Sequence, residues 1–496
     1  MRICGIIFVM SRTTALLLLL CISVFAAAVA VAYGVFQAVP HLEDEQANLF
    51  AAQVFASGKL YVPSPSQPAA FFVPFVIEWE GRRVSKYPPG YSLVLALGVM
   101  AHTPWFVNPL LGSLTLVATF ALGRVIFTDA NGEQTALLAV ILAAISPMFL
   151  GLSSALLSHA LSLLLLTIFA WAFIHSAFRA QCPMLYAAIA GIALGWTALT
   201  RPLTALAYVA PFGLWAIWLM IQRKARLRTC VVMACVAGAI AALLPLYQWL
   251  LTGDPWVNLY TAWWSYDAIG FGPGHGPLPE GHSLASALNN ANLDLMSLLT
   301  DLHGWPNLSW ILFVPGLLMP PRGRREAALV IPLAALAIAH SFYWVRGSGI
   351  YGPRYWYEAF PFLWLLSARG LVKLWDRGQR RQTRHVCIRL GLALLIALDV
   401  AVTIPAQFSF WRGLYFVTNE PWRAVQQANL HNALVIVRGS LWTDYGAVSW
   451  ANTPTLNGDV VFAHELVEGN EAIIAQYPGR SVYLLDGAQL TPLNNQ

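Results

Sequence analysis

The chain has 496 residues, of which 58% are hydrophobic and 10% are charged. A soluble domain carries about 25% charged residues, so this composition excludes a soluble enzyme and predicts a polytopic membrane protein. The formal net charge of +6 then reports on membrane orientation rather than on nucleic-acid binding.

Apolar segments long enough to approach the thickness of a bilayer recur along the chain. Eleven are predicted to be transmembrane helices, at residues 13–36, 105–126, 135–150, 158–178, 185–200, 203–221, 229–250, 307–319, 326–344, 358–374 and 388–408. Residues 90–103 are also apolar, but this stretch is short and lies between Pro89 and Pro104. It is predicted to be an interfacial helix. The predicted fold class is an all-α polytopic membrane protein.

The distribution of basic residues predicts the orientation. With the N-terminus in the cytoplasm, eighteen of the 29 Lys and Arg residues lie on the cytoplasmic side, and residues 252–306 contain none. Counting 90–103 as a span would reverse all the later loops. The positive-inside rule therefore predicts a multi-pass protein of the inner (plasma) membrane. Its extracytoplasmic parts are the loops 37–104 and 251–306 and the tail 409–496.

The tail is expected to fold separately from the membrane domain, residues 1–408. Its strand-like runs are residues 433–437, 460–463 and 481–485. They alternate with helical stretches near 421–430 and 469–476. The tail, residues 409–496, is therefore predicted to be a small α/β cap on the outer face.

Two charged motifs in the first external loop are candidates for chemistry. Asp44 and Glu45 follow the first span, and Lys86 and Tyr87 precede two prolines that keep Lys86 out of a helix interior. A carboxylate and an ammonium on one loop could serve as a base and an anion clamp. The alternative is that the acids begin a helix and that the lysine is solvated.

Two arginines lie at the outer ends of spans, where basic residues are disfavoured. Arg201 separates two helices, and Arg354 precedes Tyr355. A guanidinium fork suits a phosphate. Alternatively, both could reach lipid headgroups, and Arg354 could pair with Glu358. His159 opens a span at the same face, where a buried, satisfied histidine is the alternative.

The remaining polar residues give weaker signals. The second external loop holds Tyr266, Asp267, His275, His282 and His303, whose spacing matches no metal signature, so no metal is predicted. Asp399 lies in the middle of the last span, where a carboxylate is costly. It is the main argument for a secondary transporter or flippase. Such a protein should show inverted repeats, and no clear repeat is present.

Several motifs occur in an order that resembles a known family. They are Asp44-Glu45, Lys86-Tyr87-Pro88-Pro89-Gly90-Tyr91-Ser92, Asn108-Pro109-Leu110-Leu111-Gly112, Ser158-His159, Leu199-Thr200-Arg201-Pro202-Leu203, Gly270-Phe271-Gly272-Pro273 and Gly352-Pro353-Arg354-Tyr355. Their order resembles GT-C fold glycosyltransferases that use polyprenyl-phosphate sugars. These include protein O-mannosyltransferases, aminoarabinose transferases and rhizobial core transferases. The tail does not match a known cap.

The resemblance implies that Asp44 is the catalytic carboxylate and that Lys86 helps to hold the lipid phosphate. The predicted function is inverting transfer of a sugar from a polyprenyl-phosphate donor to a hydroxyl of a glycan, lipid or protein acceptor, without a cofactor. Asp44 acts as base, with Glu45 as a second catalytic candidate. The predicted substrate-binding residues are Lys86, Tyr87, His159, Arg201, Arg354 and Tyr355.

Overall fold

The structure is a computed structural model that describes residues 11–178, 181–222, 226–320, 323–379, 382–466 and 468–493. Some basic residues behind the orientation prediction lie outside these ranges: Arg2, Arg179, Arg223, Lys224, Arg322, Arg380 and Arg381.

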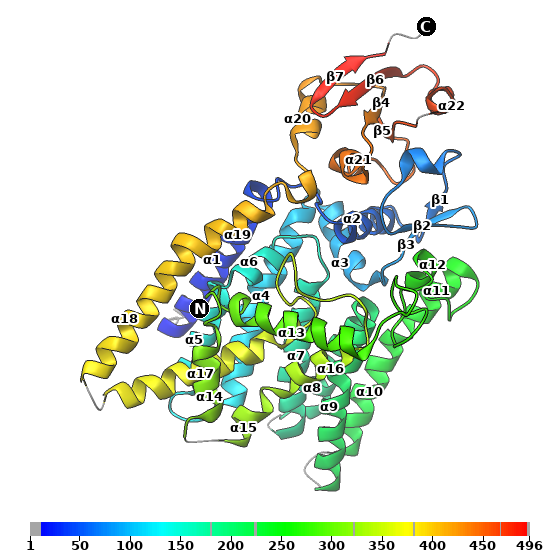
Figure 1. The fold of residues 1–496 in the computed structure, drawn as a ribbon. Coiled ribbons are helices and arrows are strands. Elements are labelled where there is room, and N and C mark those ends of the chain that lie inside the picture. Colours follow the sequence, from blue (N-terminus) through cyan, green and yellow to red (C-terminus); the bar gives the residue numbers. More distant parts are fainter. Residues whose placement is uncertain are drawn as a thin grey trace, which may run out of the picture.

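Most of the described chain forms a bundle of apolar helices, with a small mixed sheet at one end (Figure 1). Within the described ranges, seven helical segments are long and apolar enough to cross a membrane. They are α1 (Arg12–Gly34), Pro104–Ile126 with η2 (Pro104–Phe106) and α4 (Val107–Ile126), α7 (His159–Phe178), α8 (Pro183–Thr200), α9 (Pro202–Ile221), Leu227–Thr252 with α10 (Leu227–Ala241) and α11 (Leu243–Thr252), and His385–Phe416. The chain is a multi-pass membrane protein.

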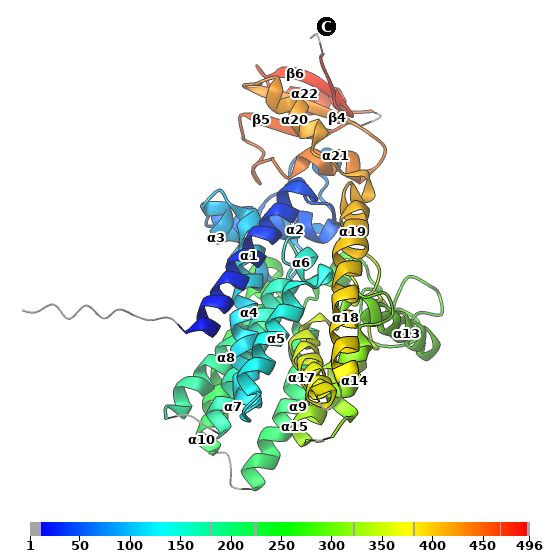
Figure 2. The same cartoon turned by 90° about the vertical axis from the view of Figure 1, so that its left-hand side faces the viewer.

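The last of these segments is the most irregular. It runs from α18 (Gln382–Leu398) through a π-helical turn, η4 (Asp399–Thr403), into α19 (Ile404–Trp411) and η5 (Leu414–Phe416). Figure 2 shows it as one long helical column along the side of the bundle.

The other four predicted spans form shorter or more polar helices. They are α5 (Gly132–Ala144) with α6 (Pro147–Leu152), α14 (Trp310–Leu318), α15 (Arg324–Ala328) with α16 (Ile331–His340), and α17 (Phe360–Gln379). Proline explains the break before α6, because Pro147 cannot donate a backbone hydrogen bond and disfavours helix at Ser146. The structure therefore does not establish a count of eleven spans.

Residues 90–103 form a short helix, as predicted. Helix α3 (Pro89–Met100) begins at a proline, whose fixed φ suits the first helical position. Its 12 residues are about 18 Å long, too short to cross the apolar core of a bilayer. Helix α3 lies near α2 (Glu43–Ala56) (Figure 2). The two helices pack through a cluster that includes Tyr91, Leu95 and Leu49.

The segment between α1 and α3 also contains a sheet that was not predicted. Strands β1 (Val62–Pro63), β2 (Val76–Trp79) and β3 (Arg82–Ser85) are antiparallel in the order β1-β3-β2. The β2–β3 hairpin turns at Glu80-Gly81, both with positive φ, as a tight hairpin requires. Because β3 is the central strand and ends at Ser85, Lys86 follows directly from the end of that strand.

The C-terminal sheet lies at the top of Figure 1, above α2. Strands β4 (Ala433–Arg438), β5 (Val460–His464), β6 (Ser481–Asp486) and β7 (Gln489–Pro492) have the order β5-β4-β6-β7, and only β7 is antiparallel. The three predicted strands and two predicted helices, α20 (Glu420–Gln427) and α22 (Asn470–Gln476), are confirmed. Sequence analysis missed β7 and helix α21 (Trp442–Ser449).

The connection from α11 to α14 holds two helices, α12 (Leu259–Trp263) and α13 (Leu284–Asp301). The connection from α16 to α17 holds one 3-10 turn, η3 (Tyr357–Ala359). Residues of both connections lie beside residues of α2 in the wall of one cavity, at the end of the bundle where α2 lies. They supply eleven of the residues that line this cavity.

Candidate active site

A cavity of about 560 Å³ lies at this end of the bundle. Seven of the eight predicted site residues line it: Asp44, Lys86, Tyr87, His159, Arg201, Arg354 and Tyr355. They come from α2, the β3–α3 turn, the first turn of α7, the junction of α8 and α9, and the loop before η3. The fold thus brings together side chains from five separate segments.

Asp44 lies in the first turn of α2 and is reached by two predicted partners. The Tyr87 hydroxyl donates a hydrogen bond to Oδ1, and Nη1 of Arg354 lies 3.9 Å from Oδ2. Burial and the Asp44 charge raise the pKa of Tyr87 well above its usual range, so this hydroxyl stays a donor. The Asp44 side chain lines the cavity and is 27% exposed.

Glu45 has a different environment and does not line the cavity. Its Oε2 accepts hydrogen bonds from the backbone N–H groups of His41 (2.8 Å) and Leu42 (3.1 Å), and its Oε1 accepts from that of Leu156 (2.7 Å). These bonds satisfy N–H groups at the start of α2 and fix α2 to the α6–α7 connection. Glu45 therefore has a structural role, and we no longer consider it a catalytic candidate.

Lys86 lies in a cage of aromatic rings. Its Nζ is 3.5 Å from the ring centre of Phe75, 4.9 Å from that of Trp264 and 5.2 Å from that of Tyr260. The side chain is 4% exposed. Burial lowers the pKa of the Lys86 ammonium, partly opposed by the nearby charge of Asp267. The rings stabilise the charge by cation–π attraction.

Asp267 joins this cage to a second loop. Its Oδ2 lies 3.4 Å from Nζ of Lys86. Its Oδ1 accepts hydrogen bonds from the Tyr343 hydroxyl (2.7 Å) and from Nε1 of Trp344 (3.2 Å). The sequence placed Asp267 only in a group considered for metal binding. Its position after Trp263-Trp264-Ser265-Tyr266 was the available signal for an aromatic site.

Two histidines of that group have other partners. Nε2 of His282 lies 3.0 Å from the Ser341 carbonyl, and Nε2 of His303 lies 3.1 Å from Oγ of Ser367. In the part of the chain that the structure describes, no three His, Cys, Asp or Glu side chains form a group that could hold a metal.

Arg201 lies between two proline-started helices and makes three polar contacts. Its Nε is 3.3 Å from Oε1 of Glu358 and 3.4 Å from Oγ1 of Thr204, and its Nη1 donates to Nε2 of His159 (3.1 Å). Glu358 is fully buried. The alternative pairing of Glu358 with Arg354 is wrong, because Glu358 pairs with Arg201 and Arg354 faces Asp44.

Three cations therefore meet at one cavity, each beside one carboxylate. The pairs are Lys86 with Asp267, Arg201 with Glu358, and Arg354 with Asp44. A guanidinium has five N–H donors, so one carboxylate contact leaves donors for another anion. Tyr355 packs beside both arginines, with its ring centre 5.7 Å from Cζ of Arg201 and 5.5 Å from Cζ of Arg354.

Asp399 does not take part in this site. Asp399 begins the π-helical turn of the last span and is fully buried. It packs so closely against Gly304 that a Cβ atom on residue 304 would lie 2.1 Å from Oδ1 of Asp399. The residue that most favoured a transporter thus lies apart from the cavity.

No protein-family model matches the sequence, and no curated protein matches it. Solved structures do match its fold. ArnT from Cupriavidus metallidurans, solved bound to undecaprenyl phosphate, has a TM-score of 0.56 and 14% identity, over 96% of this chain and 91% of ArnT. AglB, an oligosaccharyltransferase from Archaeoglobus fulgidus solved with an inhibitory peptide and a dolichol-phosphate, has a TM-score of 0.50 and 16% identity.

The second match covers 87% of this chain and 63% of AglB. Both proteins are glycosyltransferases with the GT-C fold. The chain therefore has the GT-C fold that its motifs predicted, while the low identity leaves its reaction to be argued from the site.

Proposed function

We propose that this chain is a membrane glycosyltransferase that moves a sugar from a polyprenyl-phosphate donor to an acceptor hydroxyl. The observation that carries the proposal is a cavity that is lined both by a partly exposed carboxylate, Asp44, and by three cations, of which Arg354 lies beside Asp44. The fold likeness supports a lipid-linked donor, since ArnT was solved with undecaprenyl phosphate and AglB with a dolichol-phosphate.

In the proposed reaction, Asp44 takes the proton of the acceptor hydroxyl while that oxygen attacks the anomeric carbon. The new carbon–oxygen bond forms as the bond from the anomeric carbon to the phosphate oxygen breaks. The bonding electrons leave with the polyprenyl phosphate, whose charge Lys86, Arg201 and Arg354 stabilise. A single displacement with no covalent sugar–enzyme intermediate inverts the anomeric carbon.

The cavity walls fit the two halves of such a donor. Tyr260, Trp264 and Tyr343 line the region around Lys86 and offer ring faces to a sugar. Leu203 of α9 and Leu244 of α11 also line the cavity, and their apolar side chains suit a prenyl chain. His159 holds Arg201 in this arrangement, and Tyr87 orients Asp44.

We further propose that the cavity faces away from the cytoplasm in the inner (plasma) membrane. The charge distribution of the loops supports this orientation. Nucleotide sugars are not available on that side, and a lipid-linked donor carries its sugar there already. Residues 1–408 then form the catalytic membrane domain and residues 409–496 an extracytoplasmic cap.

Purified protein incubated with a panel of radiolabelled polyprenyl-phosphate sugars tests the proposal. The expected result is release of polyprenyl phosphate, with the label passing to an acceptor or to water. Asp254→Asn serves as the matched control for the Asp44→Asn variant. The Asp254 side chain is exposed and does not line the cavity, and its Oδ1 accepts a hydrogen bond from the Trp256 N–H (2.9 Å). Absence of release from every donor, in protein that is folded, would contradict the proposal.

A further inference from the structure

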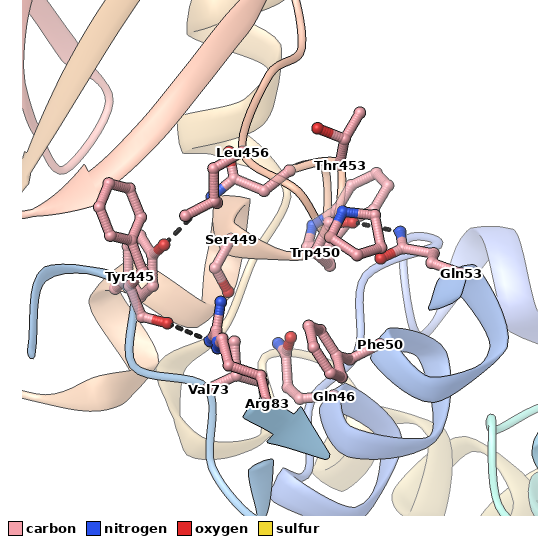
Figure 3. Close-up of a pocket in the computed structure, with 13 residues that line it drawn as sticks. Gln46, Phe50, Gln53, Val73, Arg83, Tyr445, Ser449, Trp450, Thr453 and Leu456 are labelled. Carbon is pink, nitrogen blue, oxygen red and sulfur yellow. Dashed lines mark hydrogen bonds between the residues drawn. The ribbon is translucent and has the colours of Figure 1, made fainter. Parts of the chain in front are cut away.

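Helix α2 presents one side to the cavity and another to the C-terminal domain, defined here as residues 417–493. Asp44 and Asn48, one turn apart, line the cavity. Gln46, Phe50 and Gln53 have spacings of four and three residues, which align side chains along one face of a helix. All three line a small cleft between α2 and the C-terminal domain (Figure 3).

The two glutamines bind backbone carbonyls of the C-terminal domain. Nε2 of Gln46 donates to the carbonyl of Gly446 (2.8 Å), within α21. Nε2 of Gln53 donates to the carbonyl of Trp450 (2.8 Å), which follows the end of α21 (Figure 3). Carbonyls at the end of a helix lack intrahelical donors, so Gln53 satisfies a group that needs a partner. The Gln46 side chain is 2% exposed, which makes its bond a buried one.

The contact between Gly446 and Gln46 is tight. A Cβ atom at Gly446 would lie 3.3 Å from Nε2 of Gln46 and 3.1 Å from the Trp442 ring. The cleft beside it holds about 20 Å³, space for about one water molecule. The two surfaces are therefore closely packed at this contact.

A second contact joins the C-terminal domain to β3, the strand that precedes Lys86. Phe71 of η1 (Pro68–Phe71) is fully buried with Leu434 and Val461 in the core of the C-terminal sheet. Nη2 of Arg83, in β3, donates to the Phe71 carbonyl. The C-terminal domain thus contacts both structural supports of the cavity: α2, which carries Asp44, and the segment that leads to Lys86.

We propose that the C-terminal domain is a positioning element for sugar transfer, and that Gln46 and Gln53 are the residues through which it fixes α2. This inference rests on the proposed function. Neither glutamine contacts the cavity, so both act through the placement of Asp44. A shift of a reacting group by about 1 Å can lower a rate about a hundredfold, which makes the placement of one helix sufficient to control turnover.

The test replaces the amides by a side chain of similar length without a donor, in Gln46→Met, Gln53→Met and the double variant. Gln426→Met, on the exposed face of α20, is the matched control. Turnover is measured with the polyprenyl-phosphate sugar that the wild type uses, and undecaprenyl phosphate is the binding probe. We expect turnover of the double variant to fall about 10- to 100-fold. Binding of undecaprenyl phosphate should stay within about twofold of wild type, because Lys86 and Arg201 lie on other elements.

Hydrogen exchange gives a readout that does not depend on activity. In the double variant, the amides of residues 46–53 should exchange faster, while those of α7 should not change. Gly446→Ala is a second variant for the case in which the methionine variants fail to fold. Alanine favours helix, yet its Cβ pushes against the Gln46 amide, so turnover should fall in a stable protein.

Unchanged turnover in folded variants would overturn the positioning role, and so would an equal loss of donor binding and turnover. These outcomes differ from failure of the proposed function, in which the wild type itself neither binds undecaprenyl phosphate nor turns over any donor.

Discussion

The Asp44 carboxylate and the Arg354 guanidinium face each other across 3.9 Å, although they come from near the start and near the end of the membrane-embedded part of the chain. Arg354 therefore has two roles in the proposed reaction, one beside the base and one beside the leaving phosphate. It lies beside the base and lines the cavity that would hold the leaving phosphate. This relationship couples the acceptor end of the site to the donor end.

Arg201 provides the sharpest test of the proposal that Lys86, Arg201 and Arg354 bind the lipid phosphate. A charge-assisted hydrogen bond contributes about 1.5–3 kcal/mol, so Arg201→Ala should weaken binding of undecaprenyl phosphate about ten- to a hundredfold. Arg201→Lys should also bind more weakly, because a point charge cannot contact Glu358, His159 and a phosphate with one planar fork. Titration calorimetry or a filter-binding assay in detergent measures this. Wild-type affinity in Arg201→Lys would show that the fork is not needed.

The buried Lys86 predicts a pH dependence of donor binding. Its pKa is lowered by burial, and an amine loses its attraction for phosphate when it loses its proton. Affinity for undecaprenyl phosphate should therefore fall as pH rises through that lowered pKa, below the pH at which an exposed lysine titrates. Asp267 raises the pKa of Lys86, so Asp267→Asn should move the fall to lower pH, and Lys86→Arg should move it upward. A profile that does not respond to either substitution would exclude Lys86 as the titrating group.

Glu45 should matter for stability rather than for the proton transfer. Glu45→Ala leaves three backbone N–H groups without their acceptor, each worth about 1–3 kcal/mol when buried. We expect a clearly lower unfolding temperature than that of the wild type, whereas Asp44→Asn should unfold near the wild-type temperature. A thermal melt in detergent decides between them. An unfolding temperature of Glu45→Ala equal to that of the wild type would contradict the structural role of Glu45.

The orientation of the protein can be checked directly. A reporter enzyme fused after Gln496 should be active only on the extracytoplasmic side, since the positive-inside rule predicts that the N-terminus and the loops with basic clusters lie in the cytoplasm. A cytoplasmic signal from this fusion would mean that residues 90–103 cross the membrane and that the cavity faces the cytoplasm.

Local patterns predicted much of the fold because they reflect local physics. The alternating runs at 433–437, 460–463 and 481–485 became strands, and Pro89 began the short helix expected near it. Strands of two to four residues around β2 and β3 are too short for a periodic signal, so the first sheet was missed. Helix α17 carries charged residues that make it a poor span by composition, so the sequence could not fix the span count.

The site was predictable where motifs carry unusual residues, and not where pairing is decided by the fold. Asp44, Lys86 and Arg201 each stood out as charges at the edge of apolar segments. Nothing in the sequence joins Lys86 to Asp267 or Arg201 to Glu358, because these pairs form only when distant loops meet. Glu45 adjoins Asp44 in sequence, but helix geometry turns it toward backbone N–H groups.

Asp44 is the proposed base for sugar transfer at this cavity. The most direct measurement is the single-turnover rate of Asp44→Asn with a saturating labelled polyprenyl-phosphate sugar, beside the wild type and the Asp254→Asn control. General base catalysis contributes about 10²–10⁴-fold, so the rate should fall by that factor while undecaprenyl phosphate still binds. A folded Asp44→Asn protein that transfers sugar at a rate near that of the wild type would contradict the account.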